Sequence, residues 1–187
     1  MLNHIVLEFD FDVNQLRDYL LNTVMPTVKE RLAKVSIVTF KHSDTQDPVM
    51  ERFNQYLMTR FGTPPILSYN LFHHLSPLNI HIDGRSDLYR HANLNLPLCG
   101  WQGNIMRFYK ENPGYAAPVP KEGSAIWCDP DQVTVYDEFE TTEDWVLVRV
   151  DQPHNIVNMD FDNPRATLSI KFVGNPTFEE LQKCFLG

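Results

Sequence analysis

Short segments rich in β-branched, aromatic or alternating apolar residues recur from residue 79 onward in this 187-residue chain. Eight such segments predict strands: Asn79–Asp83, Ala92–Leu98, Asn104–Tyr109, Ser124–Cys128, Gln132–Tyr136, Trp145–Val150, Asn155–Asn158 and Ala166–Phe172. Turn formers separate many of them, as at Asp83-Gly84 and Asn163-Pro164. Eight short strands in this span are what a double-sheet jelly roll requires. We therefore predict a mainly β protein whose core is a double-stranded β-helix (jelly roll, cupin-like).

The pattern before residue 70 is mixed, with two helical segments and one strand. Val13–Val24 carries apolar residues near helical spacing. Val49–Phe61 reads as a second helix, with Asp47 as its N-cap and Pro48 in its first turn. Val35–Phe40 reads as a strand between them. We therefore expect an N-terminal α/β cap over residues 1–70 and a β core over residues 71–175.

The last residues predict a short helix, because Thr177 can cap it and Glu180 stands three positions later. This C-terminal helix would occupy residues 176–187. A chain of this length is large enough to bury one sizeable core, so we expect a single domain over residues 1–187.

The composition is that of an ordinary globular domain, with 43% hydrophobic and 21% charged residues. No apolar run approaches the roughly 20 residues that a membrane span needs. The first residues lack the basic start and long apolar middle of a signal peptide. Three cysteines, at Cys99, Cys128 and Cys184, show no metal-finger spacing. We therefore expect a reducing, cytoplasmic setting, no membrane partner and no disulfide framework.

The formal net charge is −8, and no stripe of basic residues is evident. Proteins that bind nucleic acids depend on clustered Lys and Arg to meet the phosphate backbone. The charge therefore argues against a nucleic-acid partner and favours a small-molecule or peptide substrate. The sequence leaves the oligomeric state open.

Chemistry enters with His81-Ile82-Asp83, because positions i and i+2 of a strand share one face. Both side chains could therefore point at one ion. An alternative is structural, since Asp-Gly is a common hairpin dipeptide and Asp83 precedes Gly84. His154 supplies a possible third ligand, although alone it is equally consistent with a histidine beside the turn at Pro153. Two imidazoles and one carboxylate are the set that holds Fe(II) on one face and leaves the opposite positions open.

Arg165 follows His154 and opens an apolar strand. An arginine that faces a barrel interior is costly unless it is paired. Its partner could be an internal acid or the distal carboxylate of a bound diacid. Thr167 shares its face and could donate a hydroxyl to the same carboxylate.

Several other polar residues remain open to two interpretations. His91, Asn93 and Asn95 alternate with apolar residues, so they form either a solvated face or the lining of a polar pocket. Arg85 and Arg90 either receive a substrate carboxylate or lie in solvated loops.

Two further groups are expected to be structural. The pair His73-His74 is expected on the surface or in the core. Trp101, Tyr109 and Trp127 are expected in the core.

Taken together, these segments resemble the Fe(II)/2-oxoglutarate-dependent dioxygenases, and within them the aspartyl/asparaginyl β-hydroxylase-like group. The matching pieces are His81-Ile82-Asp83, Arg90-His91 with the alternating strand up to Pro97, His154, and Arg165-Ala166-Thr167. They span about half of the chain. Those β-hydroxylases often carry Gly at the position of Asp83, so the metal dyad matches the wider superfamily more closely.

The resemblance implies a role for each matching residue. His81, Asp83 and His154 would bind iron, Arg165 and Thr167 would bind the distal carboxylate of 2-oxoglutarate, and His91 would lie near the metal-binding end of that co-substrate. The expected function is an oxygenase that uses Fe(II) and 2-oxoglutarate to hydroxylate a small polar molecule or a polar side chain.

Two rival functions fit the same fold. A cupin-type metal protein would use the barrel and the ligands without 2-oxoglutarate. A non-catalytic jelly-roll binding protein would retain only the shape, because fold does not determine function. Arg165 discriminates between them, since only the 2-oxoglutarate enzyme needs it.

Overall fold

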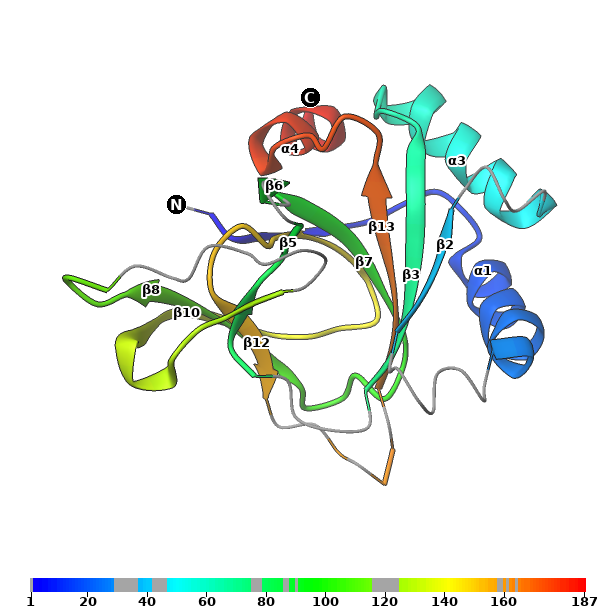
Figure 1. The fold of residues 1–187 in the computed structure, drawn as a ribbon. Coiled ribbons are helices and arrows are strands. Elements are labelled where there is room, and N and C mark those ends of the chain that lie inside the picture. Colours follow the sequence, from blue (N-terminus) through cyan, green and yellow to red (C-terminus); the bar gives the residue numbers. More distant parts are fainter. Residues whose placement is uncertain are drawn as a thin grey trace.

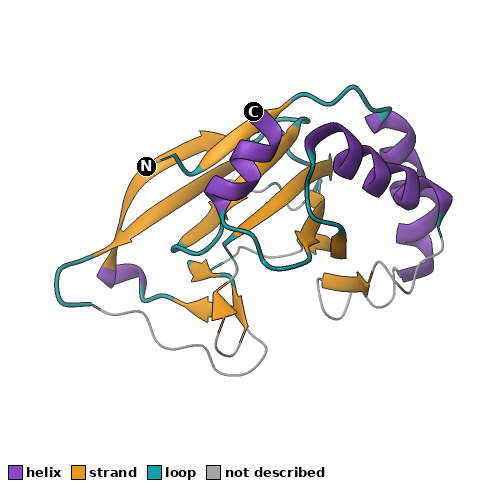
Figure 2. Ribbon diagram, turned by 90° about the horizontal axis from the view of Figure 1, so that it is seen from above, coloured by secondary structure: helices purple, strands orange, loops and turns teal. Residues whose placement is uncertain are grey.

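The computed structural model describes residues 2–28, 37–41, 47–74, 79–85, 88–89, 91–115, 125–157, 160, 162–163 and 165–187. Two antiparallel sheets dominate it (Figures 1 and 2). This confirms the mainly β, jelly-roll core that the sequence predicted. Within the described residues, no helix is long and apolar enough to span a membrane.

The larger sheet has six strands in the order β1, β11, β7, β13, β3, β2, and all neighbours are antiparallel. Its strands are β1 (His4–Leu7), β2 (Ile37–Lys41), β3 (Ile66–His74), β7 (Ala92–Cys99), β11 (Trp145–Arg149) and β13 (Arg165–Phe172). β13 lies between β7 and β3, so the residues that it carries are central to the sheet.

The smaller sheet has the order β10, β8, β12, β4, β9 and is also antiparallel. Its strands are β4 (His81–Ile82), β8 (Ile105–Glu111), β9 (Ile126–Trp127), β10 (Val133–Glu140) and β12 (His154–Val157). Two further short strands, β5 (Gly84–Arg85) and β6 (Leu88–Tyr89), pair with each other.

The helices pack against the outer face of the larger sheet. They are α1 (Val13–Tyr19), which continues into the π-helix η1 (Leu20–Val24), α3 (Pro48–Phe61) and α4 (Phe178–Leu186); a short 3-10 helix, η3 (Pro130–Gln132), precedes β10. Figure 1 shows α1 and α3 beside β2 and β3, with α4 at the end of β13. Trp145 of β11 stacks on Phe53 of α3 with ring centroids 4.8 Å apart, within one continuous apolar core.

Two predicted helix starts are present as expected. The Asp47 side chain accepts hydrogen bonds from the backbone N–H groups of Val49 and Met50, and Pro48 occupies the first turn of α3. Thr177 and Glu180 form the reciprocal capping box of α4. These local signals act within one turn, which is why the sequence alone could reveal them.

The inner face of the larger sheet is divided between apolar and polar residues. Val146 and Val148 of β11 pack with Met106 and Phe108 of β8 between the two sheets. Polar side chains of β7 and β13 take the neighbouring part of this face and line a cavity. Asn93 and Asn95 of β7 therefore point inward, so the polar stripe of this strand lines a pocket and is not a solvated face.

The sheet begins earlier in the chain than the sequence indicated. β3 starts at Ile66, within the region expected to form the cap, and β1 and β2 add further strands of that region to the same sheet. The pattern of β3 concealed it, because Ser68 and Asn70 alternate with the apolar residues and both are depleted in, or neutral for, strands. In the folded chain both are buried, since β3 has neighbours on each side.

Candidate metal centre

Two histidines distant in the sequence are direct neighbours in the smaller sheet. His81 begins β4, His154 begins β12, and their Cα atoms are register partners. Directly opposed residues of an antiparallel pair point to the same face. The two rings consequently lie together, with their centroids 4.5 Å apart.

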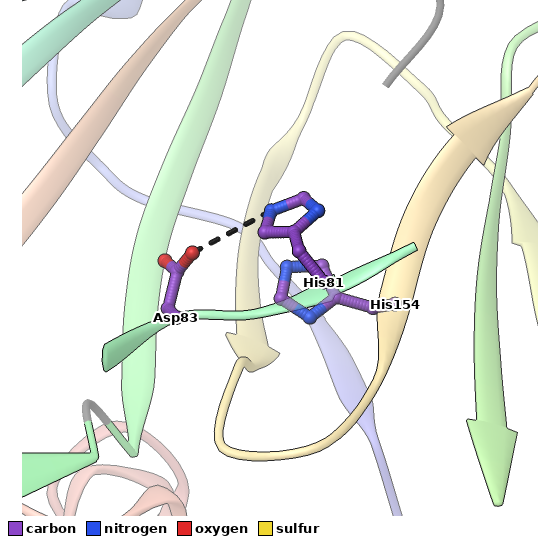
Figure 3. Close-up of side chains that lie close together, drawn as sticks. All are labelled: His81, Asp83 and His154. Carbon is purple, nitrogen blue, oxygen red and sulfur yellow. Dashed lines mark ion pairs between the residues drawn. The ribbon is translucent and has the colours of Figure 1, made fainter. Parts of the chain in front are cut away.

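Asp83 completes the group (Figure 3). It stands two residues after His81, and its Oδ1 lies 3.6 Å from His81 Nε2. One ligand atom from each of His81, Asp83 and His154 can be chosen so that all three lie within 4.8 Å of one another. The structure therefore brings together the three residues that the sequence singled out for a metal.

Backbone carbonyls orient both imidazoles in the same manner. His81 Nδ1 lies 2.8 Å from the Asn79 carbonyl oxygen, and His154 Nδ1 lies 2.9 Å from that of Gln152. A carbonyl oxygen only accepts, so each Nδ1 carries the proton and donates it. With Nδ1 as the donor, Nε2 is the ring nitrogen that each histidine can offer to a metal, which is the arrangement that second-shell partners produce in metal sites.

Asp83 is held at both its backbone and its carboxylate. Its N–H donates to the Val150 carbonyl oxygen at 2.9 Å. Its Oδ2 accepts from Asn93 Nδ2 at 2.9 Å, which leaves Oδ1 toward His81. Asp83 therefore does more than form a turn before Gly84, because its carboxylate faces the two histidines (Figure 3).

The environment keeps His154 neutral. Burial, followed by the nearby His81, lowers the pKa of the His154 imidazole to about 4, although Asp83 acts in the opposite direction. At neutral pH this ring is therefore unprotonated. An unprotonated imidazole is the form that a metal binds.

A cavity of about 70 Å³ opens beside this group. Side chains from both sheets line it: Phe72, His81, Asp83, Asn93, Asn95, Met106, Val150, His154, Asn155, Ile156, Arg165, Thr167 and Ser169. The polar residues come mainly from β4, β7, β12 and β13, and the apolar ones from β3, β8, β12 and the loop after β11. The candidate metal ligands and the predicted carboxylate-binding residues thus share one cavity.

Arg165 and Thr167 lie on the inner face of β13, as the alternation predicted. They are 5% and 3% exposed, and neither Arg165 Nε nor Thr167 Oγ1 has a hydrogen-bond partner in the described part of the chain. Burial lowers the pKa of the Arg165 guanidinium to about 10, so it remains charged at neutral pH. No ion pair joins Arg165 to an acid in the described part of the chain, so the internal-acid alternative finds no support there.

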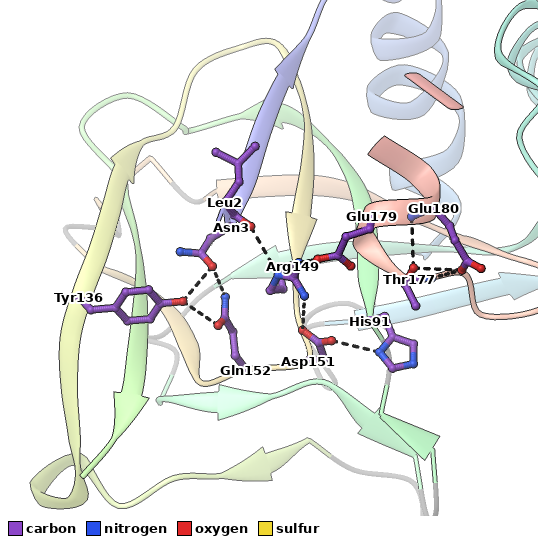
Figure 4. A network of polar contacts seen from close by, with 10 residues as sticks. All are labelled: Leu2, Asn3, His91, Tyr136, Arg149, Asp151, Gln152, Thr177, Glu179 and Glu180. Atoms are coloured by element: carbon purple, nitrogen blue, oxygen red, sulfur yellow. Dashed lines mark hydrogen bonds and ion pairs between the residues drawn. The ribbon is translucent and has the colours of Figure 1, made fainter. Parts of the chain in front are cut away.

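His91 is not brought into the cavity. Its Nδ1 lies 3.1 Å from Asp151 Oδ2, and Asp151 also pairs with Arg149 at 3.7 Å. Arg149 in turn pairs with Glu179 of α4 (Figure 4). His91 precedes the first residue of β7, where the chain has not yet entered the sheet, so its side chain joins this outer network.

The same network braces the loop that connects β11 to β12. Gln152 Nε2 donates to Asn3 Oδ1 at 2.5 Å, and Tyr136 donates its hydroxyl to Gln152 Oε1 at 2.7 Å (Figure 4). The backbone of this loop supplies the two carbonyls, of Val150 and Gln152, that hold Asp83 and His154. No local sequence pattern indicates this brace, because its partners are far apart in the chain.

Other predicted residues fall in different places. Arg90 lies outside the described residues, as do the side chains of Arg85, His73 and His74. Trp127 is not a core residue. It is 55% exposed and lies beside His81 with ring centroids 5.5 Å apart, because β9 is an edge strand.

Ser169 is a cavity residue that was not selected as a candidate from the sequence. It follows Arg165 and Thr167 at the same two-residue interval, so the polar alternation of the strand already contained the signal.

Comparisons with known proteins add one structural neighbour. No known family model matches the chain, and no curated protein matches it. Among 13 matching chains of solved structures is the crystal structure of the epimerase SnoN in complex with Fe3+, alpha ketoglutarate and nogalamycin RO. The match has 13% sequence identity and a TM-score of 0.49, and it covers 90% of this chain and 78% of that one. The function proposed below rests on the geometry of the site in this chain.

Proposed function

We propose that this chain is an Fe(II)- and 2-oxoglutarate-dependent oxygenase that hydroxylates a small polar molecule or a polar side chain. One observation carries the proposal. The donor atoms of His81, Asp83 and His154 converge in a cavity that also holds the buried Arg165, whose Nε has no hydrogen-bond partner among the described residues. A metal centre and a carboxylate-binding group in one cavity are what the reaction requires.

The ligand set fits iron. Two neutral imidazoles and one carboxylate form the facial set found in non-haem Fe(II) oxygenases, which keeps the remaining positions free for substrates. The Nδ1 hydrogen bonds of His81 and His154 leave their Nε2 atoms as the available metal ligands, and the Asn93 hydrogen bond fixes the Asp83 carboxylate. Iron, when bound, supplies the oxygen chemistry that no protein side chain can perform, and 2-oxoglutarate supplies the accompanying electrons.

Arg165 and Thr167 supply the proposed co-substrate site. A guanidinium binds a carboxylate through two parallel hydrogen bonds, and a hydroxyl on the same strand face can add a third. Arg165 Nε and Thr167 Oγ1 are buried without a hydrogen-bond partner among the described residues, and such atoms cost about 1–3 kcal/mol each when left unsatisfied, more when charged. A bound dicarboxylate removes this cost, which is why we assign its distal carboxylate to these residues.

The apolar lining restricts water around the reacting groups. Val150, Met106 and Ile156 cover the side of the cavity that the smaller sheet and the connecting loop contribute. Where water is excluded, the attraction of Arg165 for a ligand carboxylate and of Asp83 for a metal cation is stronger than it would be in water. The protein residues thus bind, orient and shield the substrates.

The proposal is tested by metal content and by 2-oxoglutarate turnover. Purified wild-type protein is expected to hold about one divalent metal per chain and, with Fe(II) and ascorbate, to release succinate from 2-oxoglutarate. His81→Ala and His154→Ala are expected to lose the metal and to reduce turnover to background, because each removes one of three ligands. His91→Ala, a histidine outside the cavity, serves as the matched control for metal content.

Wild-type metal content in folded His81→Ala and His154→Ala would contradict the metal assignment. Metal binding without any 2-oxoglutarate binding would instead favour the cupin-type alternative.

A further inference from the structure

Five polar atoms on the cavity wall have no hydrogen-bond partner among the residues that the structure describes. They are Asn93 Oδ1, Asn95 Oδ1, Arg165 Nε, Thr167 Oγ1 and Ser169 Oγ. Buried polar groups are almost always paired, so ligands or ordered waters must satisfy these atoms in the working protein. Their hydrogen-bonding character therefore describes what the cavity binds.

Asn93 presents an acceptor to the cavity. Asn93 is 3% exposed, and its side-chain Nδ2 donates to Asp83 Oδ2 at 2.9 Å. A carboxylate only accepts, so the amide nitrogen must face Asp83 and the amide oxygen must face away. The orientation of this amide is thus determined by chemistry, and the unpaired atom is a carbonyl oxygen that requires a donor.

The proposed co-substrate cannot supply that donor. At neutral pH, 2-oxoglutarate is a dianion with two carboxylates and a ketone, all of which only accept hydrogen bonds. It suits the donors of Arg165 and Thr167 on β13. It leaves Asn93 Oδ1 without a partner.

The strand register places the acceptor at the metal end of the cavity. Asn93 contacts Asp83, Asn95 pairs with Ser169, and Thr167 pairs with Pro97. Successive inward residues of a strand stand about 6.7 Å apart. Asn93, Asn95 and Ser169 therefore form a polar row near the metal ligands. Arg165 precedes Ser169 by four residues on β13, so it lies on the side of Thr167 that is away from Asn93.

We infer that Asn93 has two roles, as a positioning residue for Asp83 and as the acceptor for a hydroxyl or amino group of the primary substrate. Asn95 and Ser169 extend this subsite along the same row. The inference rests on the proposed function for the identity of the co-substrate. It narrows the primary substrate to alcohols or amines whose donor group lies close to the carbon that faces the metal.

The test uses a pool of small alcohols, each paired with its methyl ether, and ligand-observed NMR on the full chain. The ether keeps the acceptor oxygen, lacks the donor and is larger by one methyl group. Binding is measured with Co(II) and 2-oxoglutarate under nitrogen, so that no turnover occurs, and again on the metal-free protein alone. Three proteins are compared: wild type, Asn93→Ala and the isosteric Asn93→Asp.

In wild type, alcohols that bind in the cavity are expected to bind at least fivefold tighter than their ethers. Asn93→Ala removes the acceptor and should lower this ratio to about one. Asn93→Asp keeps an acceptor oxygen at the same place and should retain the preference. Both variants lose the hydrogen bond to Asp83, so both are expected to change the visible absorption of bound Co(II).

Equal binding of alcohols and ethers in wild type, or no cavity binding by any alcohol, would overturn the inference. Ordered water would then be the partner of the polar row. Loss of the preference in Asn93→Asp would also overturn it, because positioning of Asp83 would then be the sole role. If neither variant folds, the wild-type ratio alone decides. An alcohol preference that persists in a protein unable to bind 2-oxoglutarate would refute the proposed function and leave this subsite standing.

Discussion

Arg165 is 5% exposed, carries a charge at neutral pH and has no acidic partner among the described residues. A buried, unpaired guanidinium is destabilising in an empty cavity, and proteins tolerate such groups where a ligand pairs with them. Its place on β13 is therefore better explained by binding than by stability. The same reasoning applies to Thr167, whose hydroxyl faces the same space.

Arg165→Ala is expected to weaken 2-oxoglutarate binding by about 2–5 kcal/mol, because a buried charge-assisted pair is lost. Arg165→Lys should recover only part of this loss, since a point charge cannot reproduce the two-pronged guanidinium. Calorimetric titration of the Zn(II)-loaded protein measures the effect. Arg107→Ala, which removes an exposed arginine paired with Glu138, is the control. Equal affinity in wild type and Arg165→Ala would indicate a cupin-type metal protein.

At the scale of elements, the loop between β11 and β12 holds two of the three candidate ligands. The Val150 carbonyl accepts from the Asp83 N–H, and the Gln152 carbonyl accepts from His154 Nδ1. The Gln152 side chain ties this loop to Asn3 and Tyr136. The position of the ligands therefore depends on a loop whose anchors lie outside the cavity.

Gln152→Ala is expected to lower the free energy of unfolding by about 1–3 kcal/mol, because each of its two side-chain hydrogen bonds contributes about 0.5–1.5 kcal/mol. Metal affinity should fall as well, by about tenfold, since the carbonyl that orients His154 loses its support. Urea unfolding and Co(II) titration measure the two effects. Gln55→Ala removes an exposed glutamine that bonds only within α3, and should change neither. Unchanged metal affinity in Gln152→Ala would show that the brace serves stability alone.

The N-cap of α4 gives a second prediction at this scale. Thr177→Ala is expected to cost about 1 kcal/mol, because the side-chain cap of Glu180 N–H is lost. Hydrogen bonds from Thr177 lower the pKa of the Glu180 carboxyl. Because the pKa of Glu180 is lower in the folded than in the unfolded protein, its ionised form stabilises the fold above the unfolded pKa of about 4.3. This stabilisation is lost as the pH falls through the folded pKa. The difference from wild type should therefore narrow below about pH 4.

Urea unfolding at pH 7 and at pH 3.5 measures both parts of that prediction. Thr27→Ala, which removes an exposed hydroxyl bonded to its own helix, is the control. A loss in Thr177→Ala that stays the same at both pH values would show that Glu180 contributes nothing to the cap.

At the scale of the whole molecule, the net charge of −8 bears on the choice of partner. A nucleic-acid substrate would be repelled by such a surface unless basic residues were clustered. The cavity is small and its wall is polar on the side of the larger sheet. We therefore extend the proposal to a small polar molecule or an exposed polar side chain as the substrate.

A screen of amino acids, short peptides and oligonucleotides tests this extension. With amino acids or short peptides, we expect succinate release coupled to a substrate mass gain of one oxygen. We expect neither with oligonucleotides, because no stripe of basic residues is evident in the sequence. Liquid chromatography with mass spectrometry gives both readouts. Activity confined to oligonucleotides would refute this choice of substrate class.

Local patterns were sufficient for part of the fold and part of the site. The alternation of β13 predicted an inward face for Arg165 and Thr167, and cap residues located the starts of α3 and α4. The alternation of β7 put Asn93 and Asn95 on one face, but the sequence left open whether that face met solvent or a pocket. The two-residue spacing of His81 and Asp83 predicted that they share a face. These features depend on residues within one strand or one helical turn, where backbone geometry acts directly.

Only the tertiary structure decided the features that depend on distant partners. His81 and His154 meet because β4 and β12 pair in one register, and β3 is a strand because β2 and β13 flank it. His91 leaves the polar stripe because Asp151 and the Arg149 network lie beside it. Trp127 is exposed because β9 lies at a sheet edge. Strand order and register are set by packing over the whole chain, which no local pattern contains.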